Sequence, residues 1–184
     1  MSQSPAFRLV TPVDEDAPRR IQRWRSLGLD TAPDPVFDEY ARVAAQGVDA
    51  PVGAVNLVGT EQHFVGLYPS SQDRGVEPET DSMRSNTCDS GYCLYTVTRK
   101  HALALDEVLD YHIFAVNPLV EDMGSRAYLG APLLDREGEP LGTLCVMDTK
   151  PHKWTAEDVA FIKAKAAEVV EVMYRRAGLL DGAG

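Results

Sequence analysis

The chain has 184 residues, of which 44% are hydrophobic and 25% are charged, and its formal net charge is −10. These values suit one globular domain with its own core, and the negative charge disfavours nucleic acid or an anionic membrane as a partner. No apolar run approaches the roughly 20 residues of a transmembrane helix, and we expect no secretory signal in the first residues. The three cysteines are an odd number, so they favour a reducing, cytoplasmic location over a disulfide framework.

The first third of the chain predicts a flexible arm and two helices. Residues 1–16 are polar and lack periodicity, which is typical of an arm, and the acidic residues before Pro18 suit a helix start. Apolar residues recur at helical spacing in both helices, which end at Gly28 and Gly47. Asp34 is the expected N-cap of the second helix. The expected buried residues are Ile21, Trp24 and Leu27 in the first helix, and Val36, Phe37, Tyr40, Val43 and Ala44 in the second.

The middle of the chain predicts short elements around a long loop, and loops of this length are often functional. Thr87 or Ser90 would cap the short helix, and Leu94 and Val97 would face inward. The expected elements are a strand at 52–58, a strand at 62–67, the loop at 68–86, a short helix within 87–100, a strand at 101–105, and a mixed segment at 111–120 that Asn117 and Pro118 interrupt.

Two apolar runs near the end of the chain give the strongest tertiary signal. They span residues 128–134 and 141–147. The sequence DREG at 135–138 lies between them and suits a tight turn, with glycine where a positive φ is required. Each run is almost continuously apolar, which predicts a hairpin that is buried on both faces at the centre of a sheet.

The last helix has clear signals at its start. Thr155 is the expected N-cap, Asp158 completes a capping box, and Trp154 would pack on Val159 as a hydrophobic staple. Residues 178–184 would form a flexible, frayed tail. The residues expected to share one buried face are Val159, Ile162, Ala166, Val169 and Met173.

This order of elements predicts an α+β architecture in a single domain at residues 17–177. Hairpins that are adjacent in sequence favour an antiparallel sheet. Helices near the two chain ends can then cover one face of that sheet.

Four sequence blocks resemble the GAF domain family of small-molecule sensors. The most specific block is YLGAPLLDREGEPLGTLCVMD at 128–148, which is similar to the family's last hairpin. The other blocks are AVNLVGTEQHFVGLYP at 54–69, CDSGYCLYTV at 88–97 and LALDEVLDYHIFAVNPLV at 103–120. The resemblance implies a GAF-like (profilin-like) central antiparallel sheet of five to six strands. It implies N- and C-terminal helices on one face, a ligand pocket with long loops and a short helix on the other, and dimers through the terminal helices.

Three specialised GAF subtypes match poorly. Cyclic-nucleotide-binding members carry a Phe before an Asp-Glu pair, whereas Ala102 occupies that place before the pair at 106–107. Bilin-binding members attach the pigment through a Cys in an aromatic and His setting, whereas Asp89 follows Cys88. Free methionine sulfoxide reductases of this fold use three spaced cysteines, and only Cys88 or Cys93 could correspond to one of them.

Cys88 and Cys93 are the candidate reactive residues. Their separation of five residues places them roughly 140° apart on a helix, so we do not expect them to share a metal or a disulfide. Packing is the ordinary role for both, whereas Cys88 could instead be a thiolate activated by a helix N-terminus. Cys145 lies within an apolar run and is expected in the core.

Asp106 is expected to end a strand beneath the pocket, and His112 is expected near the pocket, with turn capping and packing as the alternatives. Phe64 and Tyr128 lie in strands, so the face they occupy decides whether they line the pocket. No metal site is expected, and the sequence does not identify a cofactor. The candidate ligand-binding residues are Phe64, Cys88, Cys93, Asp106, His112 and Tyr128.

We therefore expect a stand-alone sensory domain that binds a small molecule under the segments 68–86 and 107–125. It would not be an enzyme, and it would signal in trans to another protein as a homodimer through the exposed sides of 155–176 and 21–27. One alternative is a thiol-based redox enzyme or sensor of the free methionine sulfoxide reductase type, acting through Cys88 and Cys93. Another is an interaction module without a ligand.

Overall fold

The computed structural model describes residues 11–88 and 90–179. Residues 1–10 and 180–184, which hold most of the predicted arm and tail, lie outside the described residues. Within the described residues, six strands form one antiparallel sheet in the spatial order β3-β2-β1-β6-β5-β4. The strands are β1 (Val52–Val58), β2 (Glu61–Tyr68), β3 (Ser85–Thr87), β4 (Leu103–Leu105), β5 (Ala127–Leu134) and β6 (Pro140–Asp148).

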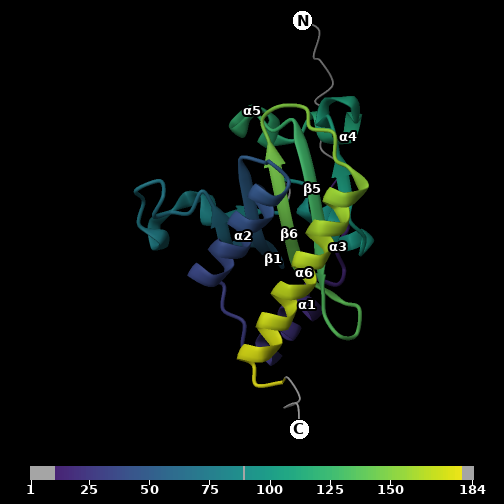
Figure 1. The fold of residues 1–184 in the computed structure, drawn as a ribbon. Coiled ribbons are helices and arrows are strands. Elements are labelled where there is room, and N and C mark those ends of the chain that lie inside the picture. Colours follow the sequence, from purple (N-terminus) through teal and green to yellow (C-terminus); the bar gives the residue numbers. More distant parts are fainter. Residues whose placement is uncertain (1–10, 89, 180–184) are drawn as a thin grey trace, which may run out of the picture.

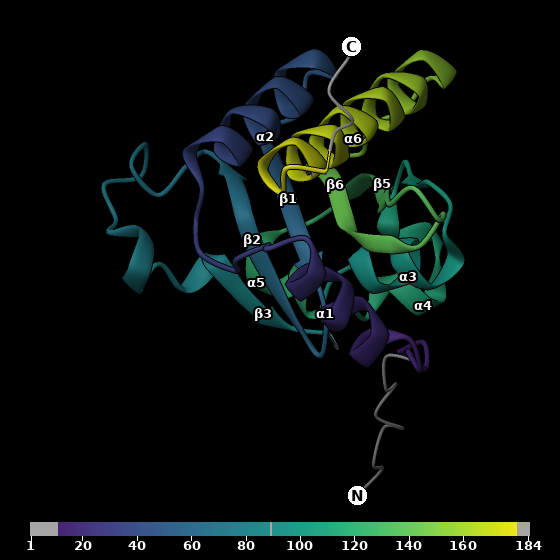
Figure 2. The same ribbon diagram turned by 90° about the horizontal axis from the view of Figure 1, so that it is seen from below.

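Helices cover both faces of this sheet. They are α1 (Ala17–Ser26), α2 (Pro35–Gly47), α3 (Cys93–Arg99), α4 (His112–Ala115), α5 (Pro118–Met123) and α6 (Ala156–Arg176). α2 and α6 lie side by side on one face (Figure 1), and α3, α4 and α5 lie on the opposite side (Figure 2). This layering is the predicted α+β architecture. In the described part of the chain, no helix combines the length and the apolar character needed to cross a membrane.

The hairpin of β5 and β6 lies inside the sheet, because β6 pairs with β1 on one side and with β5 on the other. Leu133 and Val146 are 0% and 1% exposed. The turn between the strands places Gly138 at a φ of 80°, a conformation that residues with a Cβ rarely adopt. The prediction of a hairpin buried on both faces is confirmed.

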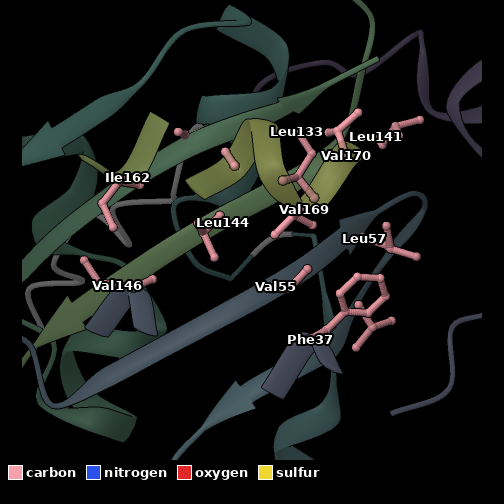
Figure 3. Packing of buried hydrophobic residues seen from close by; sticks show 14 of the residues in the cluster. Phe37, Val55, Leu57, Leu133, Leu141, Leu144, Val146, Ile162, Val169 and Val170 are labelled. Carbon is pink, nitrogen blue, oxygen red and sulfur yellow. The ribbon is translucent and has the colours of Figure 1, made fainter. Parts of the chain in front are cut away.

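Alternate side chains of the central strands build the core under α2 and α6 (Figure 3). Val55 and Leu57 face this core from β1, and Leu144 and Val146 face it from β6. Ile162 of α6 is fully buried against them. The alternation leaves the intervening residues of each strand for the opposite face of the sheet.

α2 lies unusually close to the sheet. A Cβ atom added to Gly53 would lie 2.2 Å from the carbonyl oxygen of Ala41. One added to Gly66 would lie 2.2 Å from that of Phe37. The expectation that Val36 is buried is wrong, since this residue is 41% exposed. The close packing of α2 places small residues against the sheet and leaves Val36 on the outer side. The buried residues of α2 are Phe37, Ala41, Ala44 and Ala45.

α3 begins later than the sequence predicts. It starts at Cys93, and its N-cap residue makes no side-chain cap hydrogen bond. The expected caps, Thr87 and Ser90, therefore do not cap it, because the chain first pairs with β2 as the short strand β3, which was not predicted. Leu94 and Val97 are buried as expected.

α6 matches its prediction closely. Thr155 and Asp158 form both hydrogen bonds of the capping box. The indole N–H of Trp154 donates to the carbonyl oxygen of Leu105 at 3.1 Å, which ties the helix start to β4. The predicted stripe faces the core, with Val159 half-buried and the others fully buried: Ile162, Ala166, Val169 and Met173.

Replacing Leu133 with alanine is expected to lower the free energy of unfolding by about 2–5 kcal/mol, because the fully buried side chain leaves a cavity. Leu134 is the matched control, since it follows in the same strand but is 39% exposed. Leu134→Ala should change stability by less than about 1 kcal/mol. Urea denaturation measures both variants, and equal losses would contradict the placement of the hairpin.

Candidate functional site

A cavity of about 380 Å³ lies on the sheet face opposite α2 and α6. Its floor comes from β1, β2, β5 and β6, and its walls come from residues 82, 83, 85, 86, 90–93, 119, 122 and 123. This volume lies within the range of small-molecule pockets. The cavity is where the sequence predicts a pocket, under the long loop and the segment before β5. Its apolar floor includes Ala54, Phe64, Tyr128, Cys145 and Met147.

A buried carboxylate, Asp81, anchors the loop over the cavity. It accepts a hydrogen bond from the Ser71 hydroxyl at 2.7 Å and from the Met83 N–H at 3.0 Å, and it pairs with Arg74. Burial by itself raises the pKa of Asp81, but the hydrogen bonds and the Arg74 charge outweigh it and hold that pKa at about 2. In the folded loop, the carboxylate is therefore ionised above about pH 2.

Arg84 extends this hydrogen-bond network from the loop to α2, which lies on the other face of the sheet. The guanidinium is 7% exposed and donates to the Ser71 hydroxyl, to the Phe64 carbonyl oxygen and to the carboxylate of Asp38. Asp38 belongs to α2 and also accepts the Leu67 N–H at 2.8 Å. One side chain thus connects the cavity wall, β2 and the helix layer.

Two buried amides position the remaining walls. Asn117 accepts the Gly91 N–H at 3.1 Å and donates to the Gly91 carbonyl oxygen at 3.0 Å, which joins α5 to the segment before α3. Gln62 of β2 donates to the carbonyl oxygens of Thr87 and Ser90. The hydrogen bonds to Ser90 and Gly91 satisfy backbone groups of the irregular segment before α3.

Two sulfur atoms meet at the cavity floor. The Sγ atoms of Cys93, on α3, and Cys145, on β6, are 3.8 Å apart. The Tyr128 hydroxyl donates to the Cys93 Sγ at 3.5 Å, and it lies 3.2 Å from the Thr96 hydroxyl. Both cysteines line the cavity and are 5% and 7% exposed.

The two thiols differ in acidity because they are buried in contact with each other. The contact with the Cys145 thiol lowers the pKa of Cys93, although burial acts in the opposite direction. The Tyr128 hydroxyl, which donates to Cys93, adds to the lowering. The same contact raises the pKa of Cys145 well above its ordinary value, and burial raises it further. Burial also raises the pKa of Tyr128, so its hydroxyl keeps its proton and stays a donor.

The structure brings three of the six candidate residues to the cavity. Phe64 reaches it from β2, Cys93 from α3 and Tyr128 from β5. Cys88 does not belong to the lining: it is partly buried and donates to the Gly59 carbonyl oxygen at 3.3 Å.

Asp106 and His112 also lie outside the cavity lining, which corrects their expected positions. Asp106 follows β4, an edge strand that takes no part in the cavity floor. Its carboxylate accepts the Trp154 N–H at 3.1 Å, and its carbonyl oxygen accepts the His152 N–H at 2.9 Å, so it holds the turn before α6. His112 is the exposed first residue of α4.

Sequence reasoning misses three residues of the site. Gln62 and Asn117 have no motif that marks them, although Asn117 before a proline is a helix-capping signal. Cys145 is buried as predicted, but it also lines the cavity. Its position two residues from Thr143 and Met147 could have shown which face it occupies, because side chains alternate along a strand.

Comparisons with known proteins agree on one family. A model of the GAF domain family matches residues 32–172. A cyclic di-GMP phosphodiesterase of Pseudomonas aeruginosa, PA2567, is 31% identical over 160 residues. That match covers 83% of this chain but 25% of the relative, so the chain spans about a quarter of the length of that curated protein.

Solved structures share the fold at low identity. The GAF domain of an Acinetobacter phosphoenolpyruvate-protein phosphotransferase has a TM-score of 0.62 and 16% identity, covering 94% of this chain and 100% of that one. The free methionine-R-sulfoxide reductase of Neisseria meningitidis, solved in complex with its substrate, has a TM-score of 0.57 and 14% identity, covering 92% and 96%. At these identities, the likeness concerns the fold alone.

Asp81→Asn is expected to lower the free energy of unfolding at pH 7 by about 2 kcal/mol. The pKa of Asp81 falls from its ordinary 3.8 to about 2 on folding. The stabilisation is therefore complete above about pH 4 and is lost as the pH falls toward 2. Urea denaturation from pH 7 to pH 2 should show the wild type and the variant converging.

Asp73→Asn is the matched control, because Asp73 lies in the same loop but is exposed. It should have the smaller effect at pH 7. A constant difference between wild type and Asp81→Asn across the whole pH range would contradict the ionised, buried carboxylate.

Proposed function

Because the chain belongs to the GAF domain family, we propose that it is a sensory or regulatory domain that binds a small molecule in the cavity described above. The main support for this proposal is the cavity itself, which has an apolar floor on the sheet and walls held by buried polar side chains. Pre-formed apolar pockets with a few placed polar groups are typical of ligand sites.

The lining favours an uncharged or cationic ligand with an apolar body. Among the described residues that line the cavity, Asp122 is charged and there is no lysine, arginine or histidine. Ser82 and Ser85 add hydroxyl groups on exposed parts of the wall. An anion in this cavity would lose its hydration without forming an ion pair, which is costly in an apolar site.

The relative from Pseudomonas aeruginosa supports regulation more than catalysis by this chain. The matched segment is about a quarter of that phosphodiesterase, so most of that protein lies outside the match. Cyclic di-GMP carries two phosphates, and the described cavity lining offers no cation for them. We therefore do not extend hydrolysis of that nucleotide to this chain.

Output from the site would pass through the sheet and through Arg84. A ligand changes a conformational equilibrium only if it binds one state more tightly. Residues 82, 83, 85 and 86 line the cavity, and Arg84 between them pairs with Asp38 of α2. A ligand that reorders this wall would therefore alter the support of α2, and through it the helix layer shared with α6.

The redox alternative that uses Cys88 with Cys93 has less support. The Cys88 thiol donates to the β1–β2 turn, whereas the Cys93 thiol faces β6. An interaction module without a ligand requires that the cavity take up no small molecule.

A thermal-shift screen tests the proposed function. Neutral compounds with an apolar body and one hydroxyl or amide group are expected to raise Tm, by mass action on the folded state. The gain reaches about 2.7 kcal/mol when the ligand is at a hundred times its Kd. Nucleotides with several phosphates should give no shift, and a response to those nucleotides alone would overturn the ligand class.

A cavity-blocking pair controls this screen. Met83→Trp places a larger side chain in the wall, so it should abolish the shift. Leu109→Trp is the control, because Leu109 is 44% exposed and does not line the cavity. Loss of the shift in both variants, or in neither, would argue against binding at this site.

We also propose that the chain forms homodimers through the terminal helices. Ala160, Ala164 and Ala167 are exposed along one side of α6, and small side chains let a second helix approach closely. Ala164→Arg should shift the mass measured by light scattering from dimer to monomer, whereas Gln72→Arg in the distant loop should not. A wild-type chain that is monomeric at high concentration would refute this arrangement.

A further inference from the structure

We infer that Cys93 and Cys145 form a two-electron redox site, at which a small hydroperoxide converts the two thiols into a disulfide within the cavity. This inference concerns a pair of residues that the proposed ligand function does not use. It does not depend on the identity, or even the existence, of the proposed ligand.

The first support is geometric. The two Sγ atoms are 3.8 Å apart, which is close to van der Waals contact. A disulfide has an S–S length of about 2.05 Å, so the sulfurs need to approach by about 1.7 Å. Cys93 is the first residue of α3 and Cys145 lies within β6, so rotation of the side chains and a small shift of one helix end would supply that movement.

The second support is access. Both cysteines line the same cavity, so a peroxide of a few atoms can reach the sulfurs although each residue is almost fully buried. Cys88 lies outside this lining. The site is therefore selective for the Cys93–Cys145 pair and for small oxidants.

The third support is a pair of buried polar residues on β1 and β6, one of them two residues from Cys145. Asn56 and Thr143 are paired across β1 and β6 and are fully buried. Asn56 Oδ1 and Thr143 Oγ1 have no hydrogen-bond partner among the described residues. Buried polar atoms without partners are costly, and these two can serve the hydroxyl group of an oxidised sulfur or the water that leaves it.

The sulfurs have distinct roles. Cys93 is the nucleophile, because its lowered pKa makes it the thiolate of the pair and the Tyr128 hydroxyl donates to it. Cys145 is the resolving thiol, because its Sγ lies 3.8 Å from the Cys93 Sγ, and this contact and burial raise its pKa.

The reaction balances with a hydroperoxide, ROOH, as the oxidant. The Cys93 thiolate attacks the terminal peroxide oxygen, the O–O bond breaks, and the leaving RO⁻ takes up the proton released when Cys93 ionised. Cys93 is now a sulfenic acid. The Cys145 sulfur then attacks the Cys93 sulfur, the S–O bond breaks, and hydroxide leaves with the Cys145 proton as water. In total, two thiols and ROOH give one disulfide, ROH and water.

Hydrogen peroxide on the Cys88→Ser protein tests the inference without any ligand. One equivalent of peroxide should remove both remaining thiols, as counted with a chromogenic thiol reagent on the unfolded protein. A non-reduced tryptic digest should contain peptides 85–99 and 137–153 joined by one disulfide, and dithiothreitol should restore both thiols. Two intact thiols after treatment, or disulfides only between chains, would overturn the inference.

Two further variants test the assigned roles. In Cys88→Ser/Cys145→Ser, Cys93 should stop at the sulfenic acid and react with dimedone. In Cys88→Ser/Cys93→Ser, Cys145 should remain a thiol under the same dose. The reverse pattern would overturn the roles. The disulfide result comes from the Cys88→Ser protein, so it stands even if one of the double variants fails to fold. A thermal-shift screen without hits would count against the proposed ligand and would not affect the redox site.

Discussion

Strand β6 has no solvent-exposed face, and the rest of the molecule is arranged around that constraint. Leu144 and Val146 point into the core under α2 and α6, whereas Cys145 and Met147 point to the cavity. A shift of one residue would exchange the two sets, so burial on both faces fixes the register strongly. The same packing that stabilises the helix layer therefore positions the floor of the site and the sulfur that it carries.

The walls of the cavity depend on a different kind of interaction. They are short helices and irregular segments, and buried polar side chains hold them through hydrogen bonds to backbone groups: Asn117, Gln62 and Asp81. Such networks fix a single arrangement when every member is satisfied. They are also easier to rearrange than an apolar core, since a ligand or an oxidised sulfur can offer new partners. This division between a rigid floor and hydrogen-bonded walls suits a regulatory site.

Local signals predicted the fold well, and non-local contacts explain what they missed. The turn at Gly138 and the capping box at Thr155 are local, and both are as expected. Apolar residues at helical spacing include Val36 among the expected core residues, and only the close approach of α2 to the sheet selects Phe37 and the alanines instead. Cys145 was predicted as core packing. Its contact with Cys93 depends on where α3 starts, which no sequence period reveals.

Amide NMR spectra under xenon pressure would test most directly whether the face of β6 opposite α6 bounds an open apolar cavity. Xenon enters dry apolar cavities without needing polar partners. We expect saturable shifts at Ala54, Tyr128 and Met147, which line the cavity, and their loss in Met83→Trp. Shifts confined to the helix side of the sheet, or none at any pressure, would contradict both the site and its dependence on β6.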